Sequence, residues 1–247
     1  MENAKPLTLR LGCIEIRTIT QVQPGEELCH TYTNLTGSKS SRREKLQSQY
    51  GFECQCQRCT DSSSTGWHID QLLEAVLCEG TNKQICKDYL FRVDEGLYCC
   101  RSCGKMKTDD EINMLLQPIY AEYENGMQCL FHGQFVSSVA HLEKALAAAT
   151  SNLHSCHWLR FEILLRLATA LKYMGESSKL ANVLSHAFAS CSLLLPRNHR
   201  LKVDLCHDLS QVAKEEKQRI HFRQLADSIS QICFGRCDEE LTGNLQF

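Results

Sequence analysis

Three cysteines within six residues constrain this chain more than any other feature: Cys54-Gln-Cys56-Gln-Arg-Cys59. Cysteines this close in sequence are poorly placed to form disulfides with one another, because a disulfide needs a defined separation of the two Cα and Cβ atoms. Their thiolates can instead converge on one tetrahedral zinc ion. The spacing therefore predicts a zinc site with three ligands here and a fourth to be supplied from elsewhere.

A second group of four cysteines lies further along the chain, in two pairs: Cys78, Cys86, Cys100 and Cys103. The strand-like residues 88–93 and a turn at 94–96 separate the pairs, which is typical of a zinc ribbon, two short hairpins around one metal. Cys99 competes with Cys100 for one ligand position. We prefer Cys100 because it keeps the two-residue spacing to Cys103.

The overall composition excludes several classes of protein. The chain has 247 residues, sixteen cysteines and a formal net charge of -2, which argues against binding to nucleic acid or to an anionic membrane. No apolar run approaches the roughly 18 to 20 residues that span a bilayer, and the polar start is no signal peptide. We therefore expect a cytoplasmic or nuclear protein whose clustered cysteines bind zinc rather than form disulfides.

The residues before the first cluster alternate between apolar and polar. Residues 8–22 predict a strand with a bulge, Pro24-Gly25 a turn, and 26–32 a second extended segment with Leu28, His30 and Tyr32 on one face. Residues 40–50 predict a short helix with a solvated basic face formed by Arg42, Arg43 and Lys45.

From about residue 110 the apolar residues recur with the period of a helix. Superposing Gly133 on Gly175 aligns Leu142 with Leu184, which predicts a repeat of about 42 residues and a tetratricopeptide-like superhelix. Such a superhelix offers a groove to partner peptides. Other histidines and cysteines in this half are predicted to pack rather than to bind metal: His154, Cys156, His157, Cys233 and Cys237.

A family resemblance follows from two neighbouring motifs. Gly25-Glu-Glu-Leu-Cys-His-Thr-Tyr32 is followed, after the basic helix, by Gln49-Tyr-Gly-Phe-Glu-Cys-Gln-Cys-Gln-Arg-Cys59. Together they resemble the end of the SET domain and the post-SET cysteine cluster of SET-and-MYND protein lysine methyltransferases. The helical repeats look like the C-terminal domain of the same family, so the resemblance extends over most of the chain.

The resemblance implies transfer of a methyl group from S-adenosylmethionine to a protein lysine. Tyr32 matches the catalytic tyrosine of the lysine channel and also contacts the cofactor, Phe52 matches the aromatic residue that packs on the cofactor, and the first cluster matches three of four zinc ligands. The family's Asn-His-Ser-Cys motif, its Gly-rich segment and its MYND finger do not occur in this sequence. Met1-Glu2-Asn3 fits the continuation of that motif, so we expect the chain to begin just after the fourth ligand and to be inactive alone. Water, Cys13 or Cys29 could fill the fourth position, or the site could be metal-free.

These observations predict an α+β fold that is mostly helical. We expect the end of a SET domain over 1–52, a post-SET zinc cluster over 53–60, a linker and ribbon over 61–109, tetratricopeptide-like helices over 110–234 and a tail over 235–247. The predicted function is that of the C-terminal part of a protein lysine methyltransferase. The alternative is a non-enzymatic adaptor that binds a partner protein.

Overall fold

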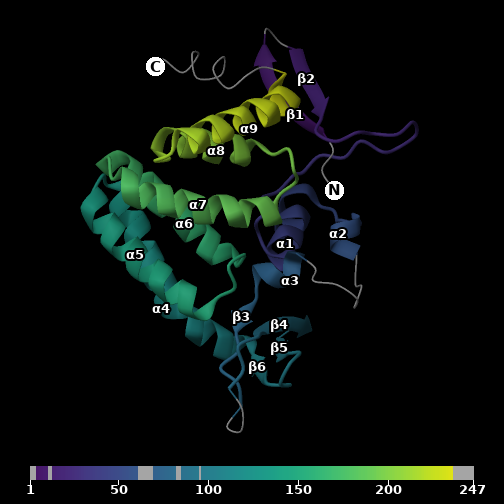
Figure 1. The fold of residues 1–247 in the computed structure, drawn as a ribbon. Coiled ribbons are helices and arrows are strands. Elements are labelled where there is room, and N and C mark those ends of the chain that lie inside the picture. Colours follow the sequence, from purple (N-terminus) through teal and green to yellow (C-terminus); the bar gives the residue numbers. More distant parts are fainter. Residues whose placement is uncertain (1–3, 11–12, 61–68, 82–84, 95, 236–247) are drawn as a thin grey trace. The chain divides into compact units, whose positions relative to one another are not determined.

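The computed structural model describes residues 4–10, 13–60, 69–81, 85–94 and 96–235 (Figure 1). The chain forms two compact units, one made of Met1–Ser62 with Cys191–Phe247 and the other of Ser63–Ser190. Long helices dominate both units, and each contains a small antiparallel sheet. This confirms the predicted fold class, mostly α with a minor β component.

The first unit begins with a two-stranded hairpin of β1 (Ala4–Arg10) and β2 (Cys13–Thr18). Their antiparallel register shifts between Leu7 and Arg10, as at a β-bulge. The prediction of one strand over 8–22 was therefore wrong, because the segment is divided between two strands. Pairing decides this outcome, since each strand supplies the hydrogen-bond partners that the other needs.

The segment expected to be extended over residues 26–32 forms no strand: the described residues 21–38 contain no helix or strand. An extended segment forms a strand only where another strand pairs with its backbone, and no described residue does so here. Local hydrogen bonds between side chain and backbone form instead. Thr33 N–H donates to the Thr31 hydroxyl, and that hydroxyl donates to the Thr33 carbonyl. The predicted turn at Pro24-Gly25 is present, with Gly25 at a φ of 83°.

Helix α1 (Lys39–Tyr50) confirms the predicted short helix. The Ser38 side chain caps its first turn, and Gly51 ends it in the left-handed conformation at a φ of 71°. The chain then turns back, and the single turn α2 (Gln57–Thr60) carries the last cysteine of the first cluster. Helices α8 (Arg200–Val212) and α9 (Glu216–Phe234) pack together in this unit, and α9 contacts β2.

The second unit contains a four-stranded antiparallel sheet in the order β3-β4-β5-β6. Its strands are β3 (Val76–Leu77), β4 (Tyr89–Asp94), β5 (Leu97–Cys100) and β6 (Met106–Thr108), preceded by α3 (Ile69–Leu73). Val76 lies opposite Leu90, which in turn lies opposite Cys100, and all three are buried. The observed β4 confirms the strand predicted over 88–93.

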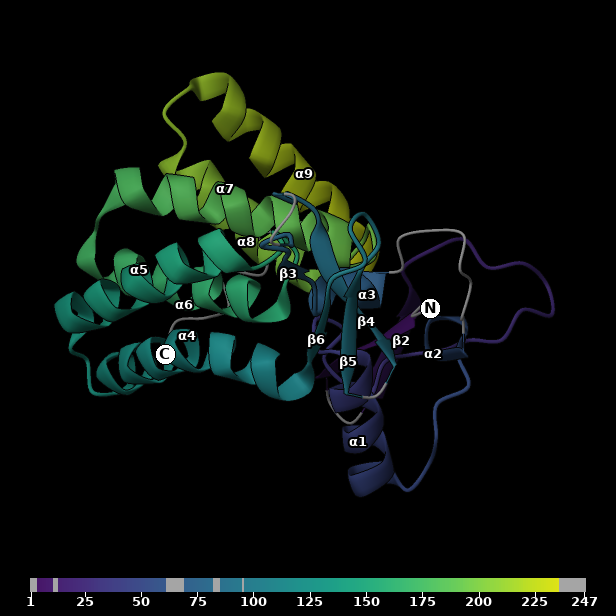
Figure 2. The same ribbon diagram turned by 90° about the horizontal axis from the view of Figure 1, so that it is seen from below.

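The sheet leads directly into helix α4 (Asp109–Phe131). Thr108 begins this helix with a capping box, in which its hydroxyl and backbone exchange hydrogen bonds with Glu111. α5 (Phe135–Asn152) and α6 (Trp158–Met174) follow and pack against one another. α4 and α5 approach closely at Gly126, where an added Cβ would lie 2.7 Å from Leu142 Cγ. Figure 2 shows the same helices from below.

The 42-residue repeat is confirmed by the helix boundaries. α5 and α7 (Ser177–Leu194) begin 42 residues apart, and so do α6 and α8. Both α6 and α8 have a histidine N-cap, His157 and His199, whose Nδ1 accepts a backbone N–H two residues later at 3.1 Å. Gly133 and Gly175 also share the left-handed conformation, at φ 70° and 71°. The helical part therefore consists of tetratricopeptide-like hairpins.

Candidate functional site

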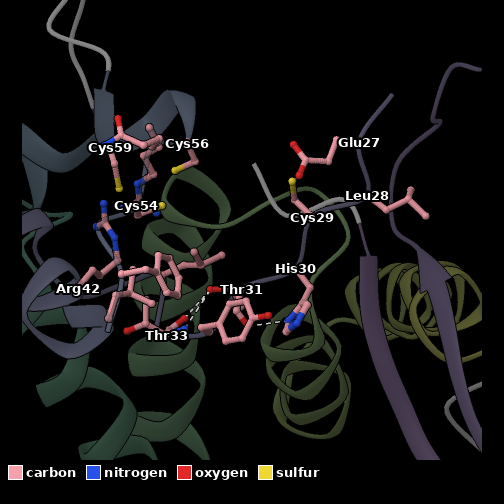
Figure 3. Close-up of a pocket in the computed structure, with 16 residues that line it drawn as sticks. Glu27, Leu28, Cys29, His30, Thr31, Thr33, Arg42, Cys54, Cys56 and Cys59 are labelled. Atoms are coloured by element: carbon pink, nitrogen blue, oxygen red, sulfur yellow. Dashed lines mark hydrogen bonds between the residues drawn. The ribbon is translucent and has the colours of Figure 1, made fainter. Parts of the chain in front are cut away.

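A pocket of about 500 Å³ in the first unit is lined by residues between Glu27 and Cys59 (Figure 3). Tyr32 lines this pocket and is at the centre of an aromatic group, of which His30 and Phe52 also line the pocket. Its ring lies 4.4 Å from that of His30, 5.1 Å from Tyr50 and 5.9 Å from Phe52. The structure thus brings together Tyr32 and Phe52, the two residues predicted to contact a cofactor.

The turn after α1 places Phe52 beside Tyr32. Tyr50 is the last residue of the helix, and Gly51 in the left-handed conformation reverses the chain immediately after it. Tyr32 remains 47% exposed and Phe52 38% exposed, so their rings form an open apolar surface. An open aromatic wall of this kind can bind a flat or cationic group.

The three cysteines of the first cluster lie on the same pocket, with their sulfur atoms within 4.8 Å of one another. The turn at α2 brings them together, since Cys59 N–H donates to the Cys56 carbonyl at 2.8 Å. Zn–S bonds of about 2.3 Å place tetrahedral sulfur ligands about 3.8 Å apart. The observed arrangement is compatible with three ligands of one zinc ion.

The thiols of this cluster have different acidities. Burial raises the pKa of Cys56, but hydrogen bonds from the Cys54 thiol and the Cys59 backbone outweigh that effect and lower it below the usual value. Burial raises the pKa of the Cys59 thiol to about 11, and its hydrogen bond with Cys56 acts in the same direction. Arg42 opposes this rise by donating to the Cys59 thiol.

The basic residues of α1 do not form the solvated face predicted for them. Arg42 is only 3% exposed, and its Nη1 donates to the Gly37 carbonyl at 2.7 Å. Arg43 is partly buried and donates to the Cys59 carbonyl at 3.2 Å, while Lys45 is exposed as expected. The sequence carried a signal for this, because Arg42 is four residues before the buried Leu46 and so shares its helix face.

No fourth cysteine joins the first cluster among the described side chains. Cys29 lines the same pocket, but it is not within 4.8 Å of all three sulfurs, and Figure 3 shows it apart from them. Cys13 was the other cysteine considered as a fourth ligand, and its side chain is not among the side chains that the structure describes.

The second cluster brings together all four predicted cysteines, with their sulfurs within 4.8 Å: Cys78, Cys86, Cys100 and Cys103. Cys100 is part of the cluster, whereas the Cys99 thiol donates to the Cys100 carbonyl at 3.7 Å and is outside it. Successive residues of a strand face opposite sides of the sheet, so only one of the two can face the other cysteines. Burial raises the pKa of the Cys78 thiol to about 12.

The other histidines and cysteines singled out in the sequence cap a helix, accept a backbone hydrogen bond or are buried, where the structure describes them. His157 caps α6 and His154 Nδ1 accepts the Cys156 N–H at 3.0 Å. Burial lowers the pKa of His157 to about 3, and the neighbouring His154 acts in the same direction. Cys233 is buried in α9, and Cys237 lies outside the described residues.

Comparison with known proteins identifies the relatives of this chain, although no family model matches it. It is 26% identical over 186 residues to Protein SET DOMAIN GROUP 41 of Arabidopsis thaliana, which covers 73% of this chain and 31% of that protein. It is 25% identical over 202 residues to the human protein-lysine N-methyltransferase SMYD4, covering 81% of this chain and 24% of that protein.

This chain is homologous to SET-domain and SMYD-type protein lysine methyltransferases over most of its length. It spans about a third or less of the length of these curated relatives. Among solved structures, a chain of nearly identical TPR-like repeats of a putative kinesin light chain from Podosopora anserina is similar. The match covers 45% of this chain and 55% of the solved chain, at 19% identity and a TM-score of 0.37. Within the described residues, no helix has the length and apolar character needed to cross a membrane.

Proposed function

We propose that this chain forms the lysine-channel and post-SET part of a protein lysine methyltransferase that uses S-adenosylmethionine. The observation that carries the proposal is the pocket shared by Tyr32, Phe52 and the three-cysteine cluster. The homologous relatives include an enzyme described as a protein-lysine N-methyltransferase, which agrees with this chemistry.

The aromatic group of the pocket suits the reaction. S-adenosylmethionine, when bound, supplies the methyl group as part of a sulfonium cation. Aromatic faces attract such a cation, and the open ring of Phe52 is available to pack on the cofactor. The Tyr32 hydroxyl would orient the incoming lysine amine, while the rings of His30 and Tyr50 fix the position of the Tyr32 ring.

The three cysteines fit zinc in a supporting role. Cys54, Cys56 and Cys59 would hold the ion, and zinc bound there would fix the segment that follows Phe52 against α1. Arg43 already holds this segment, through the Cys59 carbonyl and a 3.6 Å ion pair with Glu53. The three cysteines and their zinc ion would therefore contribute to the reaction by positioning Phe52 beside Tyr32.

We expect no methyl transfer from this chain alone. Lysine methylation needs a neutral amine held in a desolvated channel. The described residues leave Tyr32 and Phe52 substantially exposed, so water has access to both rings. Cofactor binding to the chain alone is expected to be weak and not stoichiometric by calorimetry.

Saturation-transfer NMR with S-adenosylmethionine tests this proposal on the purified chain. We expect transfer to the cofactor methyl and adenine protons that is lost in Phe52→Ala. Phe131→Ala is the matched control, because Phe131 is an exposed phenylalanine of the other unit, and it should leave the signal unchanged. Equal signals from the two variants would refute the role of the pocket, and methylation of a histone or peptide lysine by the chain would refute the predicted inactivity.

A further inference from the structure

The sulfur separations of the second cluster are compatible with four ligands of one tetrahedral metal ion. Cys78 Sγ lies 3.5 Å from Cys103 Sγ, and Cys86 Sγ lies 3.6 Å from Cys100 Sγ. These separations are close to the roughly 3.8 Å expected for thiolates bound to a single zinc ion. The four cysteines come from three places: the end of β3, the approach to β4, and the β5–β6 turn.

Backbone N–H groups point at three of the four sulfurs. Gly80 N–H donates to Cys78 Sγ at 3.4 Å, and the backbones of Asp88 and Lys105 donate to the sulfurs of Cys86 and Cys103. A neutral buried thiol packs as a small apolar group and needs no such donor. Such backbone donors fix the orientation of the sulfurs, as outer-shell hydrogen bonds do for metal ligands.

The turn that joins β5 to β6 is shaped to present two of the sulfurs. Gly104 adopts a φ of 71°, and its N–H donates to the Cys100 carbonyl at 2.9 Å. Cys100 N–H in turn donates to the Lys105 carbonyl at 2.8 Å. These bonds hold Cys100 and Cys103 at opposite ends of a tight loop, which directs both side chains to the same point.

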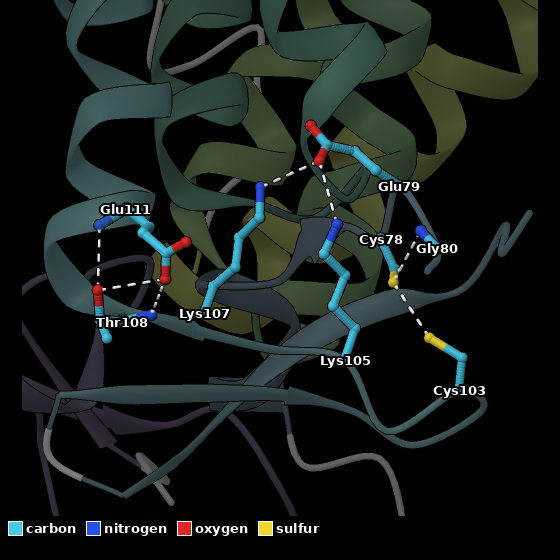
Figure 4. A network of polar contacts seen from close by, with 8 residues as sticks. All are labelled: Cys78, Glu79, Gly80, Cys103, Lys105, Lys107, Thr108 and Glu111. Carbon is cyan, nitrogen blue, oxygen red and sulfur yellow. Dashed lines mark hydrogen bonds and ion pairs between the residues drawn. The ribbon is translucent and has the colours of Figure 1, made fainter. Parts of the chain in front are cut away.

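The charges near the cluster are suited to an anionic metal centre. Four thiolates around Zn²⁺ carry a net charge of about -2. Lys105 and Lys107 both approach the carboxylate of Glu79, the residue after Cys78, at 3.3 Å (Figure 4). The two ammonium groups and the one carboxylate carry a net charge of +1, and this group would compensate part of the charge of the centre.

The cluster is also part of the core of the second unit. Cys78 and Cys100 are 1% and 0% exposed, and they belong to one apolar cluster with Leu90 of the sheet and Ile112 and Leu116 of α4. We propose that Cys78, Cys86, Cys100 and Cys103 bind a structural zinc ion that joins the four-stranded sheet to the start of the helical repeats. This inference does not depend on the proposed methyltransferase function.

Metal analysis of the purified full chain tests the proposal. Cys86→Ser should lower the zinc content by about one ion per chain, as measured by plasma mass spectrometry after gel filtration. Cys86 is partly exposed and packs at the edge of the core, so its substitution should disturb packing less than a change at the buried Cys78 or Cys100. Cys99→Ser is the matched control, because the Cys99 thiol is outside the cluster, and it should retain the zinc content of the unmutated chain.

A second measurement applies even if Cys86→Ser fails to fold. A chain with Cys54, Cys56 and Cys59 all replaced by serine keeps only the second cluster, and Co²⁺ added to it should give the visible bands of a tetrahedral thiolate site. Zinc should abolish these bands at one equivalent. Equal zinc in Cys86→Ser and Cys99→Ser, no tetrahedral cobalt spectrum, or purification with iron in place of zinc would each overturn the proposal.

Discussion

The two cysteine clusters differ both in their spacing in the sequence and in their surroundings in the structure. The four-cysteine cluster is built from strands and a tight turn, and two of its sulfurs are buried in the core of the second unit. The three-cysteine cluster lies on a loop and a single helical turn, beside an open pocket. Closed sites of four protein ligands are typical of structural zinc, whereas a site next to a pocket can serve a reaction. The surroundings therefore suggest different roles for the two clusters, and the predictions below test this contrast.

The largest effect is expected from removing a buried ligand of the four-cysteine cluster. Cys100→Ala should destabilise the second unit by at least about 5 kcal/mol, since structural zinc contributes on the order of 10 kcal/mol in isolated zinc peptides. Hydrogen exchange followed by mass spectrometry should show loss of protection in β5 and α4. Protection in α8 and α9, which belong to the other unit, should persist.

Cys54→Ala is the matched substitution in the three-cysteine cluster. We expect it to increase exchange around α1 and α2 and to leave α4 protected. The contrast between the clusters fails if Cys54→Ala and Cys100→Ala expose the same peptides.

Acid should destabilise the second unit through His157. This residue is 2% exposed, and its pKa falls from an ordinary 6.5 to about 3 because of burial. Between these pH values His157 is protonated in the unfolded chain but stays neutral in the folded chain. The free energy of unfolding therefore decreases progressively as the pH falls from about 6.5 towards 3. The expected loss between pH 7 and pH 5 is about 2 kcal/mol, measurable by urea unfolding.

His157→Asn keeps an N-cap side chain and removes the titrating group. The variant should lose this part of the acid sensitivity. His199→Asn is the control at the equivalent position of the repeat, where the histidine is only partly buried. An unchanged pH profile in His157→Asn would contradict the assignment.

Arg42 offers a test of the three-cysteine cluster alone. Arg42→Gln should weaken zinc binding there by about tenfold, because the donor to the Cys59 thiol is changed and groups that support metal ligands typically contribute 10- to 100-fold. Competition with a chromophoric chelator measures the affinity. Lys107→Gln beside the other cluster should have a smaller effect, since its charge acts from a distance; the reverse order would argue against a role for Arg42.

The smallest effect is expected from Gly126→Ala. The new methyl group would lie 2.7 Å from Leu142 Cγ, and this overpacking should lower the free energy of unfolding by about 1–3 kcal/mol. The better helix propensity of alanine offsets up to about 1 kcal/mol of this loss. We expect a net loss near 1 kcal/mol by thermal unfolding with no change in zinc content. Loss of zinc would show that packing between α4 and α5 controls the metal site.

Local patterns in the sequence predicted much of the molecule. The helix of residues 40–50 and the ribbon strand follow from short-range periodicity. The 42-residue repeat follows from internal similarity, and the placing of Cys100 rather than Cys99 follows from its spacing to Cys103. The alternating segment over 26–32 forms no strand, for a different reason. Alternation describes a strand's faces, but a strand also needs a partner whose identity the pattern does not contain.

The sequence by itself determined which residues could act together. The spacing lets Cys54, Cys56 and Cys59 share at most one metal ion, and the repeat predicts stacked hairpins after residue 110. Only the tertiary structure decided their surroundings. It buried Arg42 beside Cys59, placed Tyr50 and Phe52 against Tyr32, and included Cys78 and Cys100 in the apolar core. Burial and long-range contacts depend on how distant segments pack, and they set the charge, acidity and access of each site.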